Sequence, residues 1–438
     1  MQMNDYSFGE ALYRYRKAAK LTQDALAEKL GVTAKAVSKW ENGAAKPTTE
    51  ALRKLAAVFG VSVESLLSLR EDTVKKSISM IVLTGGPCAG KTTALSWIQN
   101  NLPQYGYTVL FVPETATELI GGGVTPQGCD SNLSYQLCQM QLQLEKERIF
   151  RQAAQSMPAE KILIVCDRGA IDNKAYMSDL DFLRLCDTLH TNEIELRDRY
   201  DAVFHLVTAA KGASDAYTTA NNAARRETPE EAAALDDKLI AAWTGHPHLR
   251  VIDNSTTFEG KLKRLLREIL SFLGEPDPLE IERKFLIEYP DVKRLAARPT
   301  CRKVDIIQTY LKAGADEEVR VRQRGENGHY TYYQTRKRTI TGMKRVEVES
   351  RLTQEEYLRL LMNADTERRQ IRKTRYCLLY ENQYFEIDVY PFRNDWAIAE
   401  IELSDETQSI VFPKEIKVIK EVTDDPRYKN AALAKQQP

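Results

Sequence analysis

Apolar residues follow three different periods along this chain. From Tyr6 to about Leu69 they recur at the three- and four-residue spacing of amphipathic helices, interrupted often enough to predict five short helices. Two later apolar runs, MIVLT from Met80 and KILIVCD ending at Asp167, predict buried strands. Beyond residue 279 polar and apolar positions alternate with a period of two, which is typical of β-strands.

Two polar interruptions divide the chain. The first is LREDTVKKSIS near residues 69–79, and the second is GEPDP at residues 274–278. At 438 residues the chain is also too long for one ordinary hydrophobic core. The pattern therefore predicts a multidomain protein with an all-α domain, an α/β domain with a parallel sheet and an antiparallel β domain, at residues 1–70, 79–273 and 279–438.

Composition limits where such a protein works. The chain has 62 Lys+Arg and 62 Asp+Glu residues, so no overall charge directs it to nucleic acid or membrane. Seven scattered cysteines without a C-x-x-C pair favour reduced thiols, and no segment has the length and apolarity of a membrane span. We therefore expect a cytoplasmic protein with no membrane partner.

The stretch LTQDALAEKLGVTAKAVSKWENG has two short helical patterns separated by a glycine-containing turn. It resembles the helix-turn-helix of the XRE (Cro/repressor-like) family, with helices at Gln23–Leu30 and about Ala34–Asn42. Residues 1–70 hold eleven Lys/Arg against seven Asp/Glu, a basic bias consistent with phosphate contact. The resemblance implies binding of double-stranded DNA, and palindromic half-sites would imply a homodimer; a helical bundle that only recruits partners is the alternative. The implied DNA contacts are Lys35, Ser38 and Lys39 at the bases and Gln23 and Asn42 at the phosphates.

A phosphate-binding motif follows the strand MIVLT. The residues from Gly85 to Thr92, GGPCAGKT, match G-x-x-x-x-G-K-[ST] between a predicted strand and a predicted helix. Backbone N–H groups of such a loop approach phosphate oxygens, the lysine neutralises them, and the threonine hydroxyl ligates Mg²⁺. The predicted phosphate contacts are Gly85, Gly90, Lys91, Thr92 and Thr93, and the predicted Mg²⁺ ligands are Thr92 and Asp167.

The class of nucleotide enzyme is less clear from these residues. Glu114 ends a predicted strand where a phosphate acceptor would lie, and Arg225 and Arg226 lie in a predicted lid. Residues 79–273 resemble the kinase-like P-loop ATPases related to nicotinamide riboside kinase domains, which implies ATP as the nucleotide. Glu114 is a candidate general base, or it caps a helix or orients a Mg²⁺-bound water. The arginines close on the transferred phosphate, or they belong to a solvated helix face.

Charged residues replace apolar ones on one face of the C-terminal strands. In LEIERKFLI, Glu280, Glu282 and Lys284 occupy every second position, so they share one face of a strand. A solvated open sheet would explain alternation, but like charges on one strand repel unless metals and phosphates lie between them. A barrel with a charged interior resolves this conflict. The same pattern recurs at Arg320 and Arg322, Lys337, Glu347 and Glu349, Lys373 and Arg375, Glu386 and Asp388, and Glu400 and Glu402.

The E-x-E-x-K motif at the start of this ordered series resembles the CYTH, or triphosphate tunnel metalloenzyme, superfamily from Leu279 to about Ala434. The resemblance implies an eight-stranded antiparallel tunnel that binds Mg²⁺ or Mn²⁺ and an inorganic or organic triphosphate. The implied catalytic residues are Glu280, Glu282 and Lys284; the implied metal ligands are Glu280, Glu282, Asp388, Glu400 and Glu402; and the implied phosphate contacts are Arg320, Arg322, Lys337, Lys373 and Arg375.

The function predicted from these segments is a metal-dependent triphosphate phosphohydrolase, joined to an ATP-binding P-loop domain and a DNA-binding helix-turn-helix. Three alternatives use the same residues. They are a transcriptional regulator that senses a nucleotide or polyphosphate without turnover, a small-molecule kinase at the P-loop, and a tunnel that acts as a class IV-type adenylyl cyclase.

Overall fold

The computed structural model divides the chain into two compact units, residues 1–77 and residues 78–438. The residues that it describes are 12–13, 15–17, 19, 21–41, 45–59, 76–213, 228–275, 281–314, 317–341, 344–403 and 408–436. Predicted contacts at Asn42, Arg225, Arg226 and Glu280 lie outside the described residues.

The N-terminal unit contains the predicted pair of helices. The Thr22 hydroxyl accepts a hydrogen bond from the Ala25 N–H and begins the first of them. Gly31, at φ +70°, ends it and starts the turn. The predicted packing residues Leu26, Leu30, Val37 and Trp40 are all buried, which confirms this part of the prediction. The helices are α2 (Gln23–Leu30), α3 (Ala34–Glu41) and α4 (Thr49–Phe59).

A five-stranded sheet of order β2-β3-β1-β4-β5 begins the second unit, and the pairs β2–β3, β1–β4 and β4–β5 are parallel. Its strands are β1 (Ser77–Gly85), β2 (Tyr107–Val112), β3 (Lys161–Asp167), β4 (Ala202–Leu206) and β5 (Leu249–Ile252). We call this part, with its helices, the P-loop region. The helices are α6 (Lys91–Asn101), α7 (Thr115–Gly121), α8 (Asn132–Ser156), α9 (Asp179–Thr188), α10 (Glu193–Arg197), α11 (Pro229–Trp243) and α12 (Phe258–Leu273), with 3₁₀ turns η1 (Leu102–Tyr105), η2 (Pro126–Gly128) and η3 (Ala170–Tyr176).

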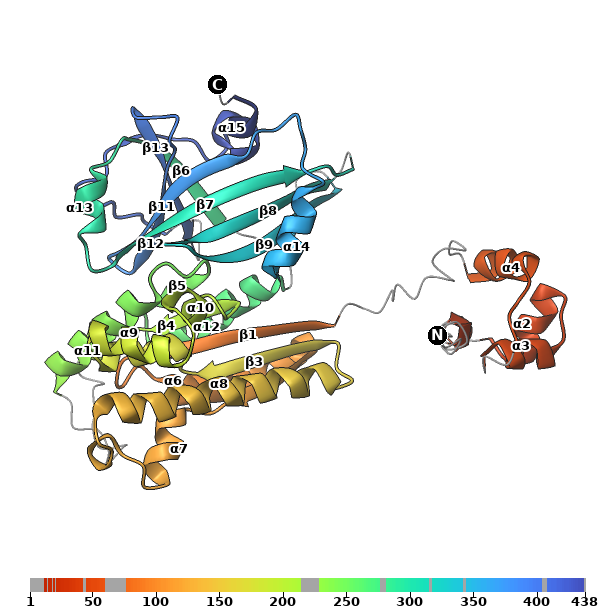
Figure 1. The fold of residues 1–438 in the computed structure, drawn as a ribbon, viewed down its shortest axis with the longest axis horizontal. Helices are drawn as coiled ribbons and strands as arrows, with labels where there is room; N and C mark the ends of the chain where they lie inside the picture. The colour runs from red at the N-terminus through yellow and green to blue at the C-terminus, as the bar shows by residue number, and fades with distance from the viewer. Residues whose placement is uncertain are drawn as a thin grey trace. The chain divides into compact units, whose positions relative to one another are not determined.

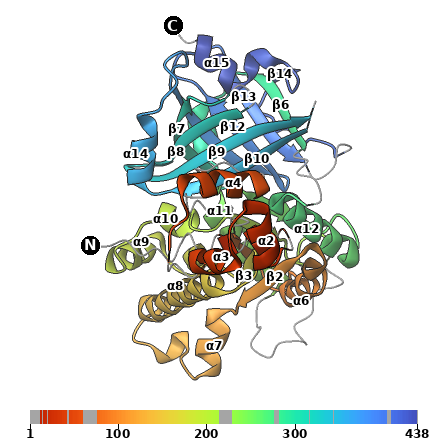
Figure 2. The same ribbon diagram turned by 90° about the vertical axis from the view of Figure 1, so that its right-hand side faces the viewer.

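Both faces of this sheet are covered, as apolar strands of a parallel sheet require. On β1, Met80 and Val82 pack toward α8 to α11, while Ile81 and Leu83 pack toward α6 and α12 (Figure 2). The carboxyl ends of the parallel strands lie along one edge, so Gly85 of β1 and Asp167 of β3 end at the same side of the sheet.

A second, antiparallel sheet follows, of order β10-β9-β8-β7-β11-β12-β13-β6-β14, and it is strongly curved (Figure 1). It has nine strands rather than eight, because the four-residue β14 adds to the edge of β6. Among the described residues no pairing joins β10 to β14. The strands are β6 (Ile281–Glu288), β7 (Cys301–Leu311), β8 (Glu317–Glu326), β9 (His329–Thr341), β10 (Lys344–Leu352), β11 (Ile371–Tyr380), β12 (Gln383–Val389), β13 (Trp396–Leu403) and β14 (Val418–Glu421).

The strand register places the charged residues of this C-terminal sheet on one face. Glu282 lies opposite Glu402, and Lys284 lies opposite Glu400. The alternate residues, Phe285 among them, are buried in an apolar cluster on the other face. A slip of one residue would exchange the two faces, so the period-two pattern sets the register. The accompanying helices are α13 (Val292–Ala296), α14 (Gln354–Leu361) and α15 (Asn430–Gln436), with the 3₁₀ turn η5 (Pro426–Tyr428).

No helix in these described ranges combines the length and the apolar composition needed to cross a bilayer. The longest, α8, has 25 residues but carries polar side chains throughout.

The loop between α11 and β5 carries a fully buried histidine. The Nε2 atom of His246 lies 3.1 Å from the Tyr200 carbonyl, and its Nδ1 accepts a hydrogen bond of 3.0 Å from the His248 N–H. One nitrogen therefore donates and the other accepts, which is the neutral form of the ring. Burial, above all, lowers the pKa of His246 to about 3.

This histidine predicts a pH dependence of stability. Its folded pKa of about 3 lies below the ordinary unfolded value of about 6.5, so the unfolded chain binds the extra proton as the pH falls. The free energy of unfolding should fall by up to about 1.4 kcal/mol per pH unit below pH 6.5 from this group alone. His246→Gln should reduce the slope between pH 6.5 and 5 in urea titrations, whereas His190→Asn, at an exposed turn, should not. An unchanged slope in His246→Gln would contradict a neutral buried ring.

Candidate active sites

The phosphate loop begins where β1 ends. Gly85 and Gly90 have φ angles of +146° and +89°, and a Cβ atom on Gly85 would lie 2.1 Å from the Leu206 carbonyl oxygen. Only glycine fits this approach between β1 and β4. The predicted strand, loop and helix are therefore present, with Lys91 as the first residue of α6.

Lys91 and Asp167 lie close enough at the carboxyl end of the sheet for their charges to interact. The Nζ atom of Lys91 donates to the Gly85 carbonyl at 3.3 Å, and burial followed by the charge of Arg168 lowers its pKa to about 8. Burial raises the pKa of Asp167, whose Oδ1 atom is buried with no hydrogen-bond partner. An unpaired carboxylate oxygen beside a phosphate loop fits a Mg²⁺ ion or its water ligands. Thr92 and Thr93 are exposed in the first turn of α6.

Glu114 follows β2 and is held by a cation. Its Oε1 atom accepts a hydrogen bond of 2.6 Å from Arg168 Nε, and its Oε2 accepts one of 2.7 Å from the Thr117 hydroxyl. Burial alone would raise the pKa of Glu114, but Arg168 and Lys91 lower it to about 2. Its side chain makes no capping bond at the start of α7, so the helix-cap interpretation is wrong.

Two buried residues that the sequence analysis did not identify support the loop. Asp236 of α11 accepts hydrogen bonds from the Gly86 N–H at 2.9 Å and from Lys211 at 3.0 Å. Lys261 of α12 donates to the carbonyls of Ala89, at 3.2 Å, and Val207, at 2.6 Å. Both lie more than a hundred residues from the motif, so no local spacing could have indicated them.

The charged face of the C-terminal sheet encloses a cavity of about 130 Å³. We call it the tunnel cavity. Charged side chains from seven of the strands line it, so most of the residues predicted for the tunnel converge on one space; Asp388 is not among those lining it. They are Glu282, Lys284, Arg320, Arg322, Arg324, Lys337, Glu349, Lys373, Arg375, Glu386, Glu400 and Glu402.

One side of the tunnel cavity is acidic, with a lysine among the carboxylates. Lys284 Nζ donates to Glu400 at 2.6 Å and to Glu282 at 3.0 Å. Burial alone would lower the pKa of Lys284, but Glu400 and Glu282 raise it above the usual value. Burial, followed by the charge of Glu400, raises the pKa of Glu282. Glu282 also lies opposite Glu402 in the register of β6 and β13, so several carboxylates gather on this side.

Asp388 lies behind this surface and holds two cations. It is fully buried, and its oxygens accept hydrogen bonds from Lys373 and, at 2.7 and 2.8 Å, from Arg375. Arg375 also reaches Glu400 at 2.9 Å. Burial followed by the charge of Arg375 lowers the pKa of Lys373 to about 8. The geometry thus makes Asp388 an anchor for the cations that line the cavity.

The opposite side of the tunnel cavity is basic. Arg320 and Arg322 project from β8 and Lys337 from β9. The Nε atom of Arg322 is buried with no hydrogen-bond partner. The Nη1 atom of the same side chain lies 3.7 Å from the carboxylate of Glu349. Burial followed by the charge of Arg320 lowers the pKa of Arg322. Crowded cations with an unused donor fit an anion with several oxygens, such as a phosphate chain.

The acidic side fits a divalent cation by its donor atoms. Mg²⁺ and Mn²⁺ prefer oxygen ligands, and Glu282 and Glu402 place carboxylates directly opposite each other. In the described part of the chain no three His, Cys, Asp or Glu side chains form a complete metal-binding group.

The P-loop region closes one end of the tunnel cavity. His248, which precedes β5, lines the cavity, and its Nε2 atom lies 3.7 Å from Glu349. Arg324 of β8 donates to Asp198 at 3.0 Å and to the Gly245 carbonyl at 2.8 Å. Asp198 and Arg324 are both almost completely buried. The sequence analysis missed these residues, because their partners lie in a different domain.

In the N-terminal unit, the predicted DNA contacts divide into two groups. Lys35 and Lys39 are exposed on α3, and Ser38 is half-buried beside them. Gln23 instead donates to Glu41 at 2.7 Å, and Arg16 reaches the same carboxylate at 2.6 Å. Gln23 is therefore held within the motif.

Together these features define a protein with a helix-turn-helix, a P-loop nucleotide fold and a charged antiparallel tunnel. Family models agree with all three: a helix-turn-helix matches residues 12–66, an AAA domain residues 80–261 and a CYTH domain residues 278–429.

Through its C-terminal domain the chain belongs to the CYTH family. An inorganic triphosphatase of Acetivibrio thermocellus is 37% identical over 157 residues, which are 36% of this chain and 93% of that protein. An inorganic triphosphatase of Nitrosomonas europaea is 36% identical over 159 residues, 35% of this chain and 96% of that protein. The HTH-type transcriptional activator BcrR of Enterococcus faecalis is 42% identical over 64 residues, 15% of this chain and 31% of that protein.

The buried pair at the domain junction predicts a large loss of stability. Asp198→Ala leaves Arg324 and Arg197 buried without their carboxylate, which should lower the free energy of unfolding by about 3–5 kcal/mol. Glu145→Ala removes an exposed carboxylate that also pairs with an arginine, and its effect on the free energy of unfolding should be much smaller because solvent screens the pair. Urea unfolding of both variants measures the difference. Equal effects would show that the junction pair contributes no more than a surface pair.

Proposed function

We propose that the chain is a metal-dependent triphosphatase whose active site is the tunnel cavity. The observation that supports this is the segregation of charge in one enclosed space, with carboxylates of β6 and β13 facing cations of β8, β9 and β11. Such a cavity suits a triphosphate that is held by its oxygens at one side and approached by a metal at the other. The two similar inorganic triphosphatases support the same reaction class.

In this proposal the basic residues bind and orient the triphosphate. Arg320, Arg322, Lys337 and Lys373 contact its oxygens, and Arg375 is held in place by Asp388. Water attacks the terminal phosphorus, the bond to the bridging oxygen breaks, and orthophosphate and pyrophosphate are the products. The cations offset the charge that develops on the phosphoryl oxygens, and Lys284 neutralises Glu400 beside them.

Glu282 and Glu402, with Glu280, would hold the Mg²⁺ or Mn²⁺ ion. When bound, this ion lowers the pKa of a water and orients the phosphate chain. We assign Glu400 and Asp388 to positioning the cations rather than to the metal, because each accepts hydrogen bonds from two cations, whereas Glu282 accepts only from Lys284 and Glu402 pairs only with Arg250 among the described residues.

The P-loop is proposed to bind ATP with Mg²⁺ through Lys91, Thr92 and Asp167. In this proposal Gly85, Gly90 and Thr93 shape the loop. Arg225 and Arg226 are proposed to close over the bound nucleotide. We favour nucleotide binding or hydrolysis over transfer to a small-molecule acceptor. A carboxylate with a pKa of about 2, as in Glu114, is a weak general base at neutral pH.

The helix-turn-helix is proposed to bind double-stranded DNA through Lys35, Ser38 and Lys39. The domains would then extend over residues 1–70, 79–273 and 279–438. The contact of Arg324 with the Gly245 carbonyl supports coupling between the nucleotide and triphosphate sites, because movement of the α11–β5 loop, which contains Gly245, would move residues that line the tunnel cavity.

Release of phosphate from tripolyphosphate with Mg²⁺ or Mn²⁺ tests the tunnel assignment. Glu282→Gln should lower the rate by about a hundredfold, because it removes a metal-binding charge. Glu288→Gln, at the exposed end of the same strand, should retain the wild-type rate. No turnover by the intact protein, with triphosphate still bound, would make the tunnel a sensor instead.

Binding of a fluorescent ATP analogue tests the P-loop separately. Lys91→Ala should weaken it by about tenfold or more, since a charge-assisted contact with phosphate is lost. Wild-type affinity in this variant would place the nucleotide elsewhere.

Binding to a mixed-sequence DNA duplex at low salt tests the helix-turn-helix. The double variant Lys35→Ala/Lys39→Ala should bind about tenfold more weakly and show a smaller salt dependence. Lys54→Ala, which removes an exposed lysine paired with Glu50 on α4, is the control. Equal affinity of all three proteins would contradict the role of α3.

A further inference from the structure

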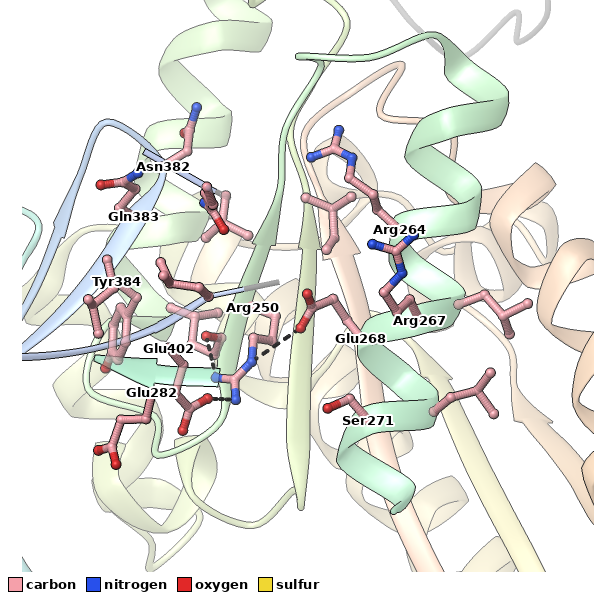
Figure 3. A pocket seen from close by; sticks show the side chains of 18 of the residues that line it. Arg250, Arg264, Arg267, Glu268, Ser271, Glu282, Asn382, Gln383, Tyr384 and Glu402 are labelled. Atoms are coloured by element: carbon pink, nitrogen blue, oxygen red, sulfur yellow. Dashed lines mark hydrogen bonds and ion pairs between the residues drawn. The ribbon is translucent and has the colours of Figure 1, made fainter. Parts of the chain in front are cut away.

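A cavity larger than the tunnel cavity lies outside it. This cleft, of about 520 Å³, lies between β5 and α12 of the P-loop region and the β12–β13 part of the C-terminal sheet (Figure 3). Its volume falls within the range of small-molecule sites. We call it the junction cleft.

The junction cleft adjoins the tunnel cavity. The residues that line both are Pro247, Glu282, Glu386, Glu400 and Glu402. All four carboxylates of this set belong to the acidic side of the tunnel. A molecule bound in the tunnel therefore has the junction cleft as the adjoining space at its acidic end.

The two walls of the junction cleft carry opposite charge. The tunnel side presents its carboxylates, while Lys263, Arg264 and Arg267 line the side formed by α12. Arg264 is fixed by Asp253, at 2.8 Å, whereas Arg267 is exposed. Figure 3 shows the guanidinium groups of Arg264 and Arg267 extending from the same helix.

Arg250 connects the two walls. It extends from β5 and pairs with Glu402 of β13 and with Glu268 of α12, the latter at 3.5 Å (Figure 3). The α12 wall is thus held beside the mouth of the tunnel by an ion pair to one of its carboxylates. The junction cleft is incomplete without the P-loop region.

We propose that the junction cleft binds the part of a substrate that extends beyond the three phosphates held in the tunnel, and that it selects a further anionic group, as in a longer linear polyphosphate. This inference rests on the proposed triphosphatase function. Cations on α12 suit phosphate oxygens. A nucleoside would instead need stacking partners, and Tyr384 is the one aromatic residue among the described residues that line the cleft, with its hydroxyl engaged by Gly245 and His246.

The test compares kcat/KM for tripolyphosphate, tetrapolyphosphate and ATP with the same metal. In Arg267→Glu the ratio of tetrapolyphosphate to tripolyphosphate should fall about fivefold or more, because an anion-binding charge is reversed. Arg148→Glu reverses another exposed arginine, on α8 and away from the cleft, and should leave the ratio at the wild-type value.

Three outcomes would overturn the proposal. The ratio of tetrapolyphosphate to tripolyphosphate does not change in Arg267→Glu, with activity on both kept; the ratio does not change because activity on both is lost equally; or only the ratio of ATP to tripolyphosphate changes, which would make the cleft a nucleoside site.

Calorimetric binding of tripolyphosphate and tetrapolyphosphate to the same proteins separates this inference from the proposed function. If the wild-type protein hydrolyses neither compound, the triphosphatase assignment fails. A weaker preference for tetrapolyphosphate binding in Arg267→Glu would still support the cleft as an anion site, and an unchanged preference would reject it.

Discussion

The contact of Glu400 with both Lys284 and Arg375 holds the charged interior of the C-terminal sheet together. These three side chains come from β13, β6 and β11, and each is shielded from water. An enclosed carboxylate without such partners would have to take up a proton, and enclosed cations would have to lose one. Mutual compensation lets the sheet keep an ionised lining, and an ionised lining is what a metal and a phosphate chain require.

The same constraint explains how the lining is organised. Charged residues occupy alternate positions of β8, β12 and β13, and the arrangement of the strands places carboxylates and cations on different sides of the cavity. Arg320 and Arg322 lie on the same face of β8, and burial followed by the charge of Arg320 lowers the pKa of Arg322. In the proposed function an anion in the cavity would offset this repulsion.

Closure of the cavity depends on a neighbouring domain. The antiparallel sheet has two unpaired edges in the described residues, and side chains from the α11–β5 loop of the P-loop region line one end of the space that it encloses. Arg324 fixes this loop by donating to the Gly245 carbonyl, and its ion pair with the buried Asp198 adds a contact from the end of α10. Two phosphate-binding folds therefore share one wall, and the junction cleft forms where they meet.

Local sequence patterns were enough to predict much of the fold and of the candidate sites. The P-loop motif, Asp167, the helix-turn-helix and the period-two charges were all predicted, because short-range spacing decides which residues share a loop, a helix turn or a strand face. Among the alternatives for Glu114 the helix cap was wrong, because its side chain pairs with Arg168, which follows β3, and makes no capping hydrogen bond. The number of strands differed from the expectation because β14 is four residues long, exposed and paired only with β6.

The sequence by itself determined the three folds, the phosphate loop and the charged face of the tunnel. Only the tertiary structure decided which charges neutralise one another, that Asp388 lies behind the cavity, and that Asp198, His248 and Arg250 of the P-loop region reach Arg324, Glu349 and Glu402. These pairs join residues far apart in the chain. Their energies depend on burial and distance, which no spacing within a segment can specify.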